Sequence, residues 1–231
     1  MSKFVPDIHS ERWVIIAPSR LARPEQRGTS STCAFCPGNE SMTPPEVYRV
    51  GEGLANKPGW KIRVIPNRYP ITDIHEVIIH SPDDSKDIDS LPLEQVVLIF
   101  QTYRQRYNVH RERGQVLIFC NHGERAGASL NHPHSQLVVV PRQINMDILH
   151  KELVNNVIEN SRFFVSYAPD FSQWPYEVWI APTNGNGKPF GDSSDDQIAD
   201  LATLLQKTIQ KLVKKFPGLA YNYYIHHGKD W

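Results

Sequence analysis

The order of strands and helices repeats along this chain, and the repeat limits the possible folds more than any other feature. HEVIIHSP at 75–82 is followed by a polar gap, a long helical pattern and the strand QVLIFCNHG at 115–123. YEVWIAP at 176–182 is followed by the same order, which ends in YNYYIHHG at 221–228, about 100 residues later. We therefore expect two similar repeats, 1–142 and 143–231.

The second copy lacks the most unusual segment of the first. After the first His-Gly the chain continues as ERAGASLNHPHSQLVVVP, whereas only Lys229, Asp230 and Trp231 follow the second. We therefore expect the second repeat to be incomplete and to lack its last strand.

Local patterns predict the individual elements. Short β-branched and aromatic runs bounded by Pro, Gly or Asn indicate strands. These runs lie at 12–17, 60–66, 75–81, 115–121, 135–140, 163–168, 176–181 and 221–227. Apolar residues at helical spacing predict helices at 92–112, 145–161 and 194–215. The Pro-, Gly-, Ser- and Thr-rich segment 24–59 is typical of an irregular loop.

Composition and charge exclude several classes of protein. The 231 residues are 40% hydrophobic and 22% charged, which is ordinary for a globular chain with a sizeable core. The chain has 25 basic residues (Lys and Arg) and 25 acidic ones (Asp and Glu), and it lacks a block of basic residues. This balance argues against nucleic acid as a partner. Apolar runs are too short to span a membrane, and the N-terminus lacks the apolar core of a signal peptide. We expect a cytoplasmic protein.

The segment GASLNHPHSQ at 127–136 is the strongest candidate for chemistry. His132 and His134 are two residues apart, so in an extended segment they point the same way. Pro133 restricts the backbone between them, and the small residues of the preceding turn allow its N–H groups to approach an anion. A neutral imidazole beside such donors can attack phosphorus. The alternative is a surface turn whose histidines only cap a strand.

Cys33 and Cys36 form a Cys-x-x-Cys pair, which in a cytosolic chain suggests metal or redox chemistry before a disulfide. Two thiolates at this spacing suit tetrahedral Zn²⁺, but a closed site needs two further ligands. The alternative is a pair of reduced thiols without metal. Cys120 lies in an apolar strand and is expected to be a buried small hydrophobe.

These motifs resemble the galactose-1-phosphate uridylyltransferase-like branch of the histidine triad superfamily. The matching stretches are WVIIAPSRLARP (13–24), CAFCPGNE (33–40), RVIPNRYP (63–70), HEVIIHSPDDSKDI (75–88), CNHGERAGASLNHPHSQ (120–136) and, more weakly, WPYEVWIAP (174–182). The resemblance implies an α+β fold of two histidine-triad-like repeats, with antiparallel sheets and packed helices. Hydrolases of the superfamily have a third histidine where this chain has Gln136, so this position favours group transfer.

The resemblance also implies a ping-pong mechanism. His134 would attack the α-phosphorus of a nucleotide sugar, expel sugar 1-phosphate and pass the nucleotide to a second phosphate acceptor. Gln136 and Ser129 would hold the α-phosphate. The other implied contacts to phosphate or nucleoside are Arg20, Arg23, Asn67, Asn121, Gly127 and Ala128. Members of the family form sites across subunits, which implies a homodimer.

For the metal, the resemblance implies structural zinc held by Cys33, Cys36 and His132. The fourth ligand of the family is commonly a histidine just after Ser81-Pro82, but this chain has Asp84 there. An aspartate oxygen can bind zinc, and His80 is a nearby alternative.

Our main expectation is a nucleotidyltransferase that moves a UMP-type group between a nucleotide sugar and a sugar 1-phosphate. Ala128 favours a different relative, because Gly-Ala-Ser also occurs in family members that act on adenine nucleotides. The alternatives are therefore an ADP-sugar phosphorylase or a dinucleoside polyphosphate phosphorylase or hydrolase. A third possibility is a nucleotide-binding protein without turnover.

Overall fold

The computed structural model describes residues 2–7, 13–22, 32–144, 154–184 and 188–225. Contacts within the chain define two compact units, each built from separate segments. Unit 1 comprises Met1–Asp87, Val109–Ile144 and Leu219–His226, and unit 2 comprises Ile88–Asn108, Asn145–Gly218 and His227–Trp231. These units are defined by contacts and do not test an internal duplication, so the two sequence repeats stay a prediction.

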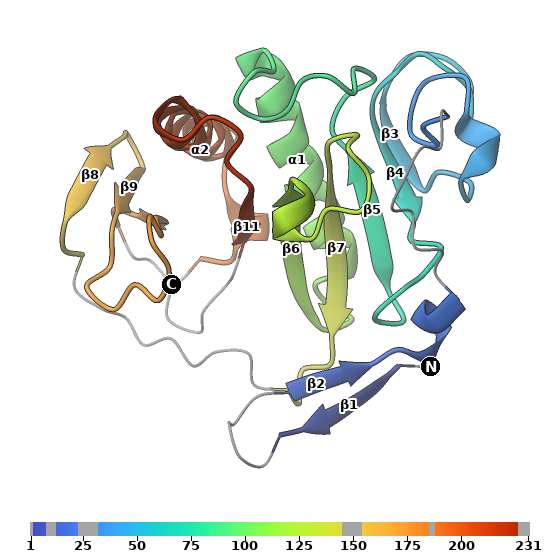
Figure 1. Ribbon diagram of the computed structural model, residues 1–231, viewed down its shortest axis with the longest axis horizontal. Helices are drawn as coiled ribbons and strands as arrows, with labels where there is room; N and C mark the ends of the chain where they lie inside the picture. The colour runs from blue at the N-terminus through green and yellow to red at the C-terminus, as the bar shows by residue number, and fades with distance from the viewer. Residues whose placement is uncertain (1, 8–12, 23–31, 145–153, 185–187, 226–231) are drawn as a thin grey trace. The chain divides into compact units, whose positions relative to one another are not determined.

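Unit 1 is organised around a six-stranded sheet in which every neighbouring pair of strands is antiparallel (Figure 1). Its order is β11 (Tyr221–Ile225), β6 (Gln115–His122), β7 (His134–Val140), β5 (His75–Ile79), β4 (Trp60–Pro66) and β3 (Tyr48–Gly51). A separate hairpin pairs β1 (Lys3–Pro6) with β2 (Trp13–Ile16). Strand β11, from the predicted second repeat, thus completes the sheet of the first.

The register of β7 decides which side chains share a face of this sheet. His134 lies opposite Ile79, and Gln136 lies opposite both Val77 and Phe119. Residues directly opposite each other in an antiparallel pair point to the same face. On this face a buried apolar cluster forms, to which Cys33, Ala34 and Leu130 add contacts. Its buried members are Phe35, Trp60, Ile65, Val77 and Ile79. Burial of this cluster stabilises the sheet that carries His134 and Gln136.

Unit 2 contains nearly all of α1 (Leu93–His110), the whole of α2 (Asp195–Lys215) and a three-stranded antiparallel sheet. The sheet order is β10 (Trp179–Pro182), β9 (Phe164–Tyr167) and β8 (Val157–Asn160). Helix α2 begins with a capping box, in which the Ser194 hydroxyl accepts from Gln197 N and the Gln197 side chain accepts from Ser194 N. Arg104 of α1 donates to the Ser193 carbonyl oxygen at 2.6 Å and pairs with Asp195.

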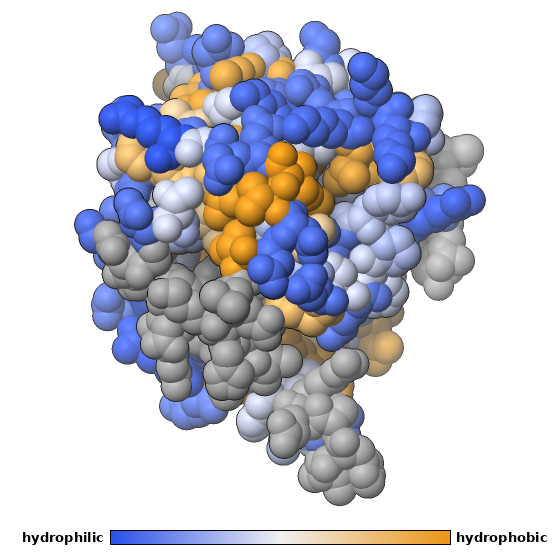
Figure 2. All heavy atoms as spheres, turned by 90° about the vertical axis from the view of Figure 1, so that its left-hand side faces the viewer, coloured by the Kyte–Doolittle hydropathy of each residue, from blue (hydrophilic) through white to orange (hydrophobic). Residues whose placement is uncertain are grey.

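Strand β8 leaves apolar side chains on the surface of unit 2. Val157 is 50% exposed and Ile158 is 45% exposed. Figure 2 shows hydrophobic residues on this side of the molecule, surrounded by hydrophilic ones. Glu159, the next residue of the strand, pairs with Lys211 of α2, which ties the strand to the helix.

Short connecting 3₁₀ turns complete the described chain. They are η1 (Pro18–Ala22), η2 (Glu40–Met42), η3 (Glu124–Ala126) and η4 (Phe190–Asp192). None of the helices in the described ranges is long and apolar enough to cross a membrane.

The α+β class, the antiparallel sheets and the two helices near 92–112 and 194–215 are confirmed. The strand prediction at 60–66 matches β4, and the other predicted strands are found with shifted ends. His226 and His227, at the end of the last predicted strand, lie outside the described residues. The expected incompleteness of the second repeat stays a prediction.

Two predictions of local structure are wrong. The helix predicted at 145–161 is contradicted at 157–160, where β8 forms, while 145–153 lies outside the described residues. Asn156 explains the difference, because its φ of 51° interrupts a helix and its side chain bonds to the Ala168 carbonyl oxygen. The predicted loop 24–59 contains β3, which becomes ordered by pairing with β4.

Candidate functional site

The orientation of His134 is set by the backbone just before it. Its Nδ1 lies 2.8 Å from the His132 carbonyl oxygen, which accepts a hydrogen bond from the ring. Nδ1 therefore carries the proton, and the lone pair is on Nε2. Burial lowers the pKa of His134 from 6.5 to about 4, so the imidazole is neutral near pH 7. A neutral ring with a free Nε2 has the electronic state that a nucleophile requires.

His134 lines a cavity of about 150 Å³ in unit 1. The cavity is lined by residues of several elements, most of them polar or small: Arg20, Asn121, Gly127, Ala128, Ser129, His134, Gln136, Ile71 and Phe119. The first seven are residues that the sequence singled out, and the fold brings them together from η1, β6, the following turn and β7. Guanidinium, amide and hydroxyl groups around an imidazole suit an anionic ligand such as phosphate.

The turn between β6 and β7 forms one wall of the cavity. It begins at Gly123 with φ 83° and contains the 3₁₀ turn η3, which is followed by Gly127 with φ 85°. Both angles lie in the region that favours glycine. A Cβ added at Gly127 would lie 3.5 Å from Asn121 Nδ2, which is an ordinary van der Waals contact, so the positive φ and not lack of space favours glycine here.

Three predicted nucleotide contacts differ in their placement. Arg20 lines the cavity, and its Nη1 donates to the Tyr69 carbonyl oxygen at 3.2 Å. Arg23 lies outside the described residues. Asn67 lies beside the cavity-lining set, where its Oδ1 accepts from Tyr69 N at 2.8 Å and its Nδ2 is 3.1 Å from His75 Nε2. The roles of all three stay predictions.

A second cluster in unit 1 has the chemistry of a metal site. Cys33, Cys36, Asp84 and His132 offer ligand atoms that all lie within 4.8 Å of one another. Burial and the neighbouring Cys33 and Asp84 raise the pKa of the Cys36 thiol to about 12. A bound divalent cation would lower this pKa again, because cysteine binds Zn²⁺ as the deprotonated thiolate. Two sulfurs, one imidazole nitrogen and one carboxylate oxygen match a four-coordinate zinc site.

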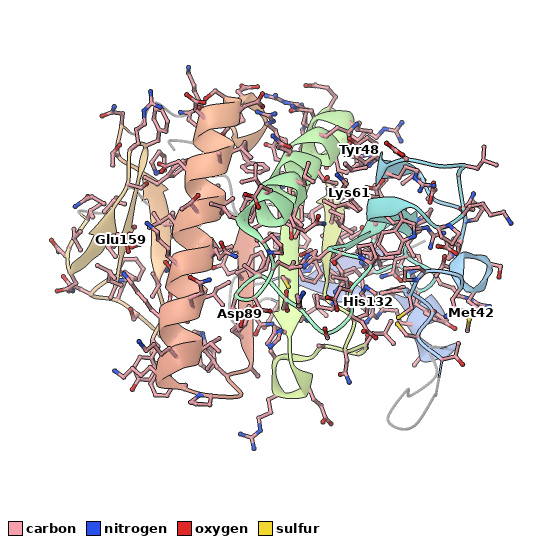
Figure 3. The ribbon with its side chains drawn as sticks, turned by 90° about the horizontal axis from the view of Figure 1, so that it is seen from above. Met42, Tyr48, Lys61, Asp89, His132 and Glu159 are labelled. Atoms are coloured by element: carbon pink, nitrogen blue, oxygen red, sulfur yellow. The ribbon has the colours of Figure 1, made fainter. Side chains whose placement is uncertain are left out.

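His132 is oriented for this role by a contact beyond the cluster. Its Nε2 donates to the Ser81 carbonyl oxygen at 2.8 Å, so the lone pair is on Nδ1. Nδ1 lies 3.4 Å from Cys33 Sγ and 3.6 Å from Cys36 Sγ. Figure 3 labels His132 on the segment that leads into β7, with sulfur atoms drawn beside it. Burial lowers the pKa of His132, which favours the neutral ligand form.

The alternative fourth ligand, His80, faces a different group. Its Nε2 lies 2.7 Å from Ser135 Oγ, and its Nδ1 lies 3.6 Å from Asp87 Oδ1. The structure therefore brings Asp84, and not His80, to the sulfurs. Cys120 is fully buried in β6, as expected for a small hydrophobic side chain.

Phe35 connects the metal cluster with the candidate nucleophile. It lies between the two cysteines in sequence, and its ring centroid is 5.3 Å from that of His134 in an edge-on arrangement. The same ring is 6.0 Å from His132. A cation at the cluster would thus fix the loop that packs Phe35 against His134.

Two residues that sequence reasoning did not select also contact the cavity-lining groups. His75 Nε2 lies 3.0 Å from Gln136 Oε1, and Asn222 Nδ2 lies 2.9 Å from Asn121 Oδ1. His75 is a polar residue at the start of the apolar strand HEVII, and this position could have marked it as a candidate site residue. Asn222 gave none, because its effect depends on β11 pairing with β6.

The fold and the site together define an α+β protein with a buried histidine in a polar cavity of about 150 Å³. Residues 72–140 match the family described as galactose-1-phosphate uridyl transferase, N-terminal domain. The chain is a homologue of galactose-1-phosphate uridylyltransferases and of ADP-glucose phosphorylase, as its motifs predicted.

Individual relatives differ in similarity and coverage. ADP-glucose phosphorylase from Arabidopsis thaliana is 29% identical over 94% of this chain and 76% of its own length. Its crystal structure with bound ADP-glucose has a TM-score of 0.73 and 28% identity, over 99% of this chain and 83% of that one. Galactose-1-phosphate uridylyltransferase from Thermotoga maritima is 23% identical over 75% of this chain and 64% of its own length.

A solved uridylyltransferase structure, with 23% identity and a TM-score of 0.75, covers 99% of this chain and 81% of its own. At this identity the likeness supports the fold alone.

Proposed function

We propose that this chain transfers a nucleoside monophosphate from a nucleotide sugar to a phosphate acceptor, with ADP-glucose as the donor and inorganic phosphate as the acceptor. One observation carries the proposal. His134 presents its unprotonated Nε2 in a cavity lined by Arg20, Asn121, Ser129 and Gln136. An unprotonated nitrogen faces groups that can neutralise and orient phosphate oxygens.

The proposed reaction has two balanced steps. In the first, His134 Nε2 forms a bond to the α-phosphorus, the bond from that phosphorus to the bridging oxygen breaks, and glucose 1-phosphate leaves with the electron pair. In the second, an oxygen of inorganic phosphate attacks the same phosphorus, the P–N bond breaks, and ADP is released. Arg20, Gln136 and Asn121 would stabilise the charge that develops on the non-bridging oxygens.

The zinc that the cysteine cluster can hold would have a structural role in this proposal. Cys33, Cys36, Asp84 and His132 would bind it, and it would fix the segment that precedes β7. This segment includes the His132 carbonyl oxygen, which orients His134.

Two findings favour ADP-glucose over our main sequence expectation of UMP transfer. The relative with the higher identity and coverage is an ADP-glucose phosphorylase, and the uridylyltransferases match at 23% and 27% identity. Ala128 in the cavity wall agrees with the adenine-nucleotide alternative that the sequence suggested. Uridylyl transfer from UDP-glucose to a sugar 1-phosphate is the second candidate, supported by the match of residues 72–140.

The test is mass spectrometry of the protein after incubation with ADP-glucose or UDP-glucose, followed by addition of phosphate or galactose 1-phosphate. We expect an added AMP mass on His134, its discharge by phosphate and the appearance of ADP. A UMP adduct that only galactose 1-phosphate discharges would instead support the second candidate. Nucleotide binding without an adduct from either donor would contradict both and indicate a binding protein.

A further inference from the structure

Two side-chain amides line the cavity, and their orientation determines which ligands it accepts. Asn121 and Gln136 each carry one oxygen that accepts hydrogen bonds and one NH₂ group that donates them. If the NH₂ groups face the cavity, the site favours phosphate. If the oxygens face it, the site repels phosphate.

The orientation of Gln136 follows from the proton on His75. Ile71 N donates to His75 Nδ1 at 3.0 Å, so Nδ1 is unprotonated and the neutral ring carries its proton on Nε2. Nε2 lies 3.0 Å from Gln136 Oε1, which accepts this bond. Asn67 Nδ2 lies 3.1 Å from the same Nε2, but it cannot donate to a nitrogen that already carries its proton. His75 is only 4% exposed, and turning its ring would break the bond to Ile71. The Gln136 oxygen is therefore occupied, and its NH₂ group is left as the donor for a ligand.

The orientation of Asn121 follows from a residue on the neighbouring strand. Asn222 of β11 lies directly opposite Asn121 of β6. Its Nδ2 donates to two oxygens, Asn121 Oδ1 and the Ala126 carbonyl, each at 2.9 Å. With Oδ1 turned to Asn222, Asn121 Nδ2 lies 3.5 Å from where a Gly127 Cβ would be, so the NH₂ group faces the turn that lines the cavity.

We propose that His75 and Asn222 are positioning residues that hold the Gln136 and Asn121 amides with both NH₂ groups toward the phosphate to be transferred. The inference rests on the proposed function for the identity of that phosphate. With Arg20, these amides give the cavity three donor groups from three separate elements. Asn222 also holds the turn that precedes Ser129, through the Ala126 carbonyl oxygen.

Asn222→Asp is the sharpest test, because it keeps the shape of the side chain and replaces its two donors with acceptors. The introduced carboxylate would repel Asn121 Oδ1, so the Asn121 amide would turn and present its oxygen to the ligand. We expect the rate of His134 nucleotidylation and the affinity for AMP to fall by about 10- to 100-fold. Asn222→Ala removes the donors without adding an acceptor and should cause a smaller loss.

Asn160→Asp is the matched control for charge and shape. Asn160 is an exposed asparagine on β8 and does not line the cavity. We expect this variant to keep wild-type affinity and rate. Thermal unfolding of all variants separates positioning from structure, because a structural role would make Asn222→Ala at least as damaging as Asn222→Asp.

His75 is tested by comparison of His75→Gln with His75→Leu. Glutamine supplies an oxygen for Ile71 N and an NH₂ group for Gln136, whereas leucine supplies neither. We expect His75→Gln to recover at least about ten times more of the nucleotidylation rate than His75→Leu, at similar unfolding temperatures.

The outcomes separate this inference from the proposed function. Rates and affinities in Asn222→Asp that equal those of Asn160→Asp, or equal rates in the two His75 variants, would overturn the positioning role even if the wild type forms an adduct. A wild type that binds AMP or UMP but forms no adduct would contradict the transfer, and a lower affinity in Asn222→Asp would then still support the donor arrangement. Failure of wild type to bind either nucleotide would overturn both.

Discussion

His134 donates from Nδ1 to the carbonyl oxygen of His132 at a distance of 2.8 Å. This bond joins the candidate nucleophile to the residue that faces the two cysteines through its own Nδ1. One short segment, 132–134, therefore supplies a ligand to the metal cluster and orients the ring in the cavity. A cation bound at the cluster would thus be linked to His134 through the backbone of Pro133 and its neighbours.

Replacement of the nucleophile gives the first prediction. His134→Ala should lower the rate of nucleotide transfer by at least about 10³-fold, because no other described residue that lines the cavity provides an imidazole. Adduct mass and product formation from ADP-glucose measure the effect. His122→Gln is the control, since His122 lies on β6 outside the cavity-lining set, and it should retain the adduct. Near-normal turnover of His134→Ala would contradict the mechanism.

The lowered pKa of His134 predicts the pH dependence of this step. Burial moves the pKa from 6.5 to about 4, so the ring stays neutral and nucleophilic through pH 5. The rate of adduct formation should be level from about pH 8 to pH 5 and fall toward pH 4. Single-turnover rates across this range measure it. A midpoint near 6.5 would show that the ring is accessible to water and not held neutral by burial.

The lowered pKa of His134 also predicts how the free energy of unfolding depends on pH. The unfolded chain binds a proton at His134 near pH 6.5, whereas the folded chain binds it only near pH 4. The stability that the folded chain gains by keeping His134 neutral is therefore fully present above pH 6.5 and is lost as the pH falls toward 4. Urea unfolding between pH 4.5 and 7.5 should show a shallower loss of stability in His134→Gln than in wild type. Equal slopes would contradict this.

The cysteine cluster predicts one zinc ion per chain. Cys33→Ser and Asp84→Ala should lower the zinc content and the unfolding temperature, whereas Asp84→His should retain zinc because imidazole nitrogen is also a zinc ligand. Elemental analysis and thermal unfolding provide the measurements. Cys120→Ala is the control, since this thiol is outside the cluster. Absence of zinc from wild type grown with added zinc would count against the site.

Arg63 provides a prediction about stability alone. Its guanidinium is buried, with Nε 2.9 Å from Glu46 Oε2 and Nη1 2.8 Å from Thr43 Oγ1. Arg63→Ala should lower the free energy of unfolding by about 3–5 kcal/mol, because the buried Glu46 carboxylate would lose its 2.9 Å pair and keep the longer 3.3 Å pair with Arg49. Arg142→Ala removes an Arg–Glu pair whose side chains are 61% and 85% exposed and should cost less than about 1 kcal/mol. Similar losses in urea unfolding would contradict this distinction.

More of the residues around the cavity than of the tertiary contacts could be selected from the sequence. Small residues and alternating histidines between two apolar strands are visible in the chain, and the structure places His134, Gln136, Ser129 and Asn121 around one cavity. The Cys33–Cys36 pair was equally visible. Asp84 was one of two candidates for the fourth ligand, and only the packed loop brought it to the sulfurs.

Local patterns also failed where distant contacts decide structure. At 157–160 a helix was expected, but pairing with β9 and the left-handed Asn156 produced a strand. Strand β3 could not be predicted from its polar segment, because it forms by hydrogen-bonded pairing with β4.

By itself, the sequence determined the chemistry that the molecule carries: the histidines, the small-residue turn, the thiols and the periodic strands around them. Those properties are local, since side-chain type and spacing along a few residues set them. Only the tertiary structure decided how that chemistry is oriented. The register of β11 against β6 places Asn222 on Asn121, and the packing of β5 beside β7 places His75 on Gln136. Hydrogen bonds between residues that are far apart in the chain have no local pattern, so they emerge only when the sheet is formed.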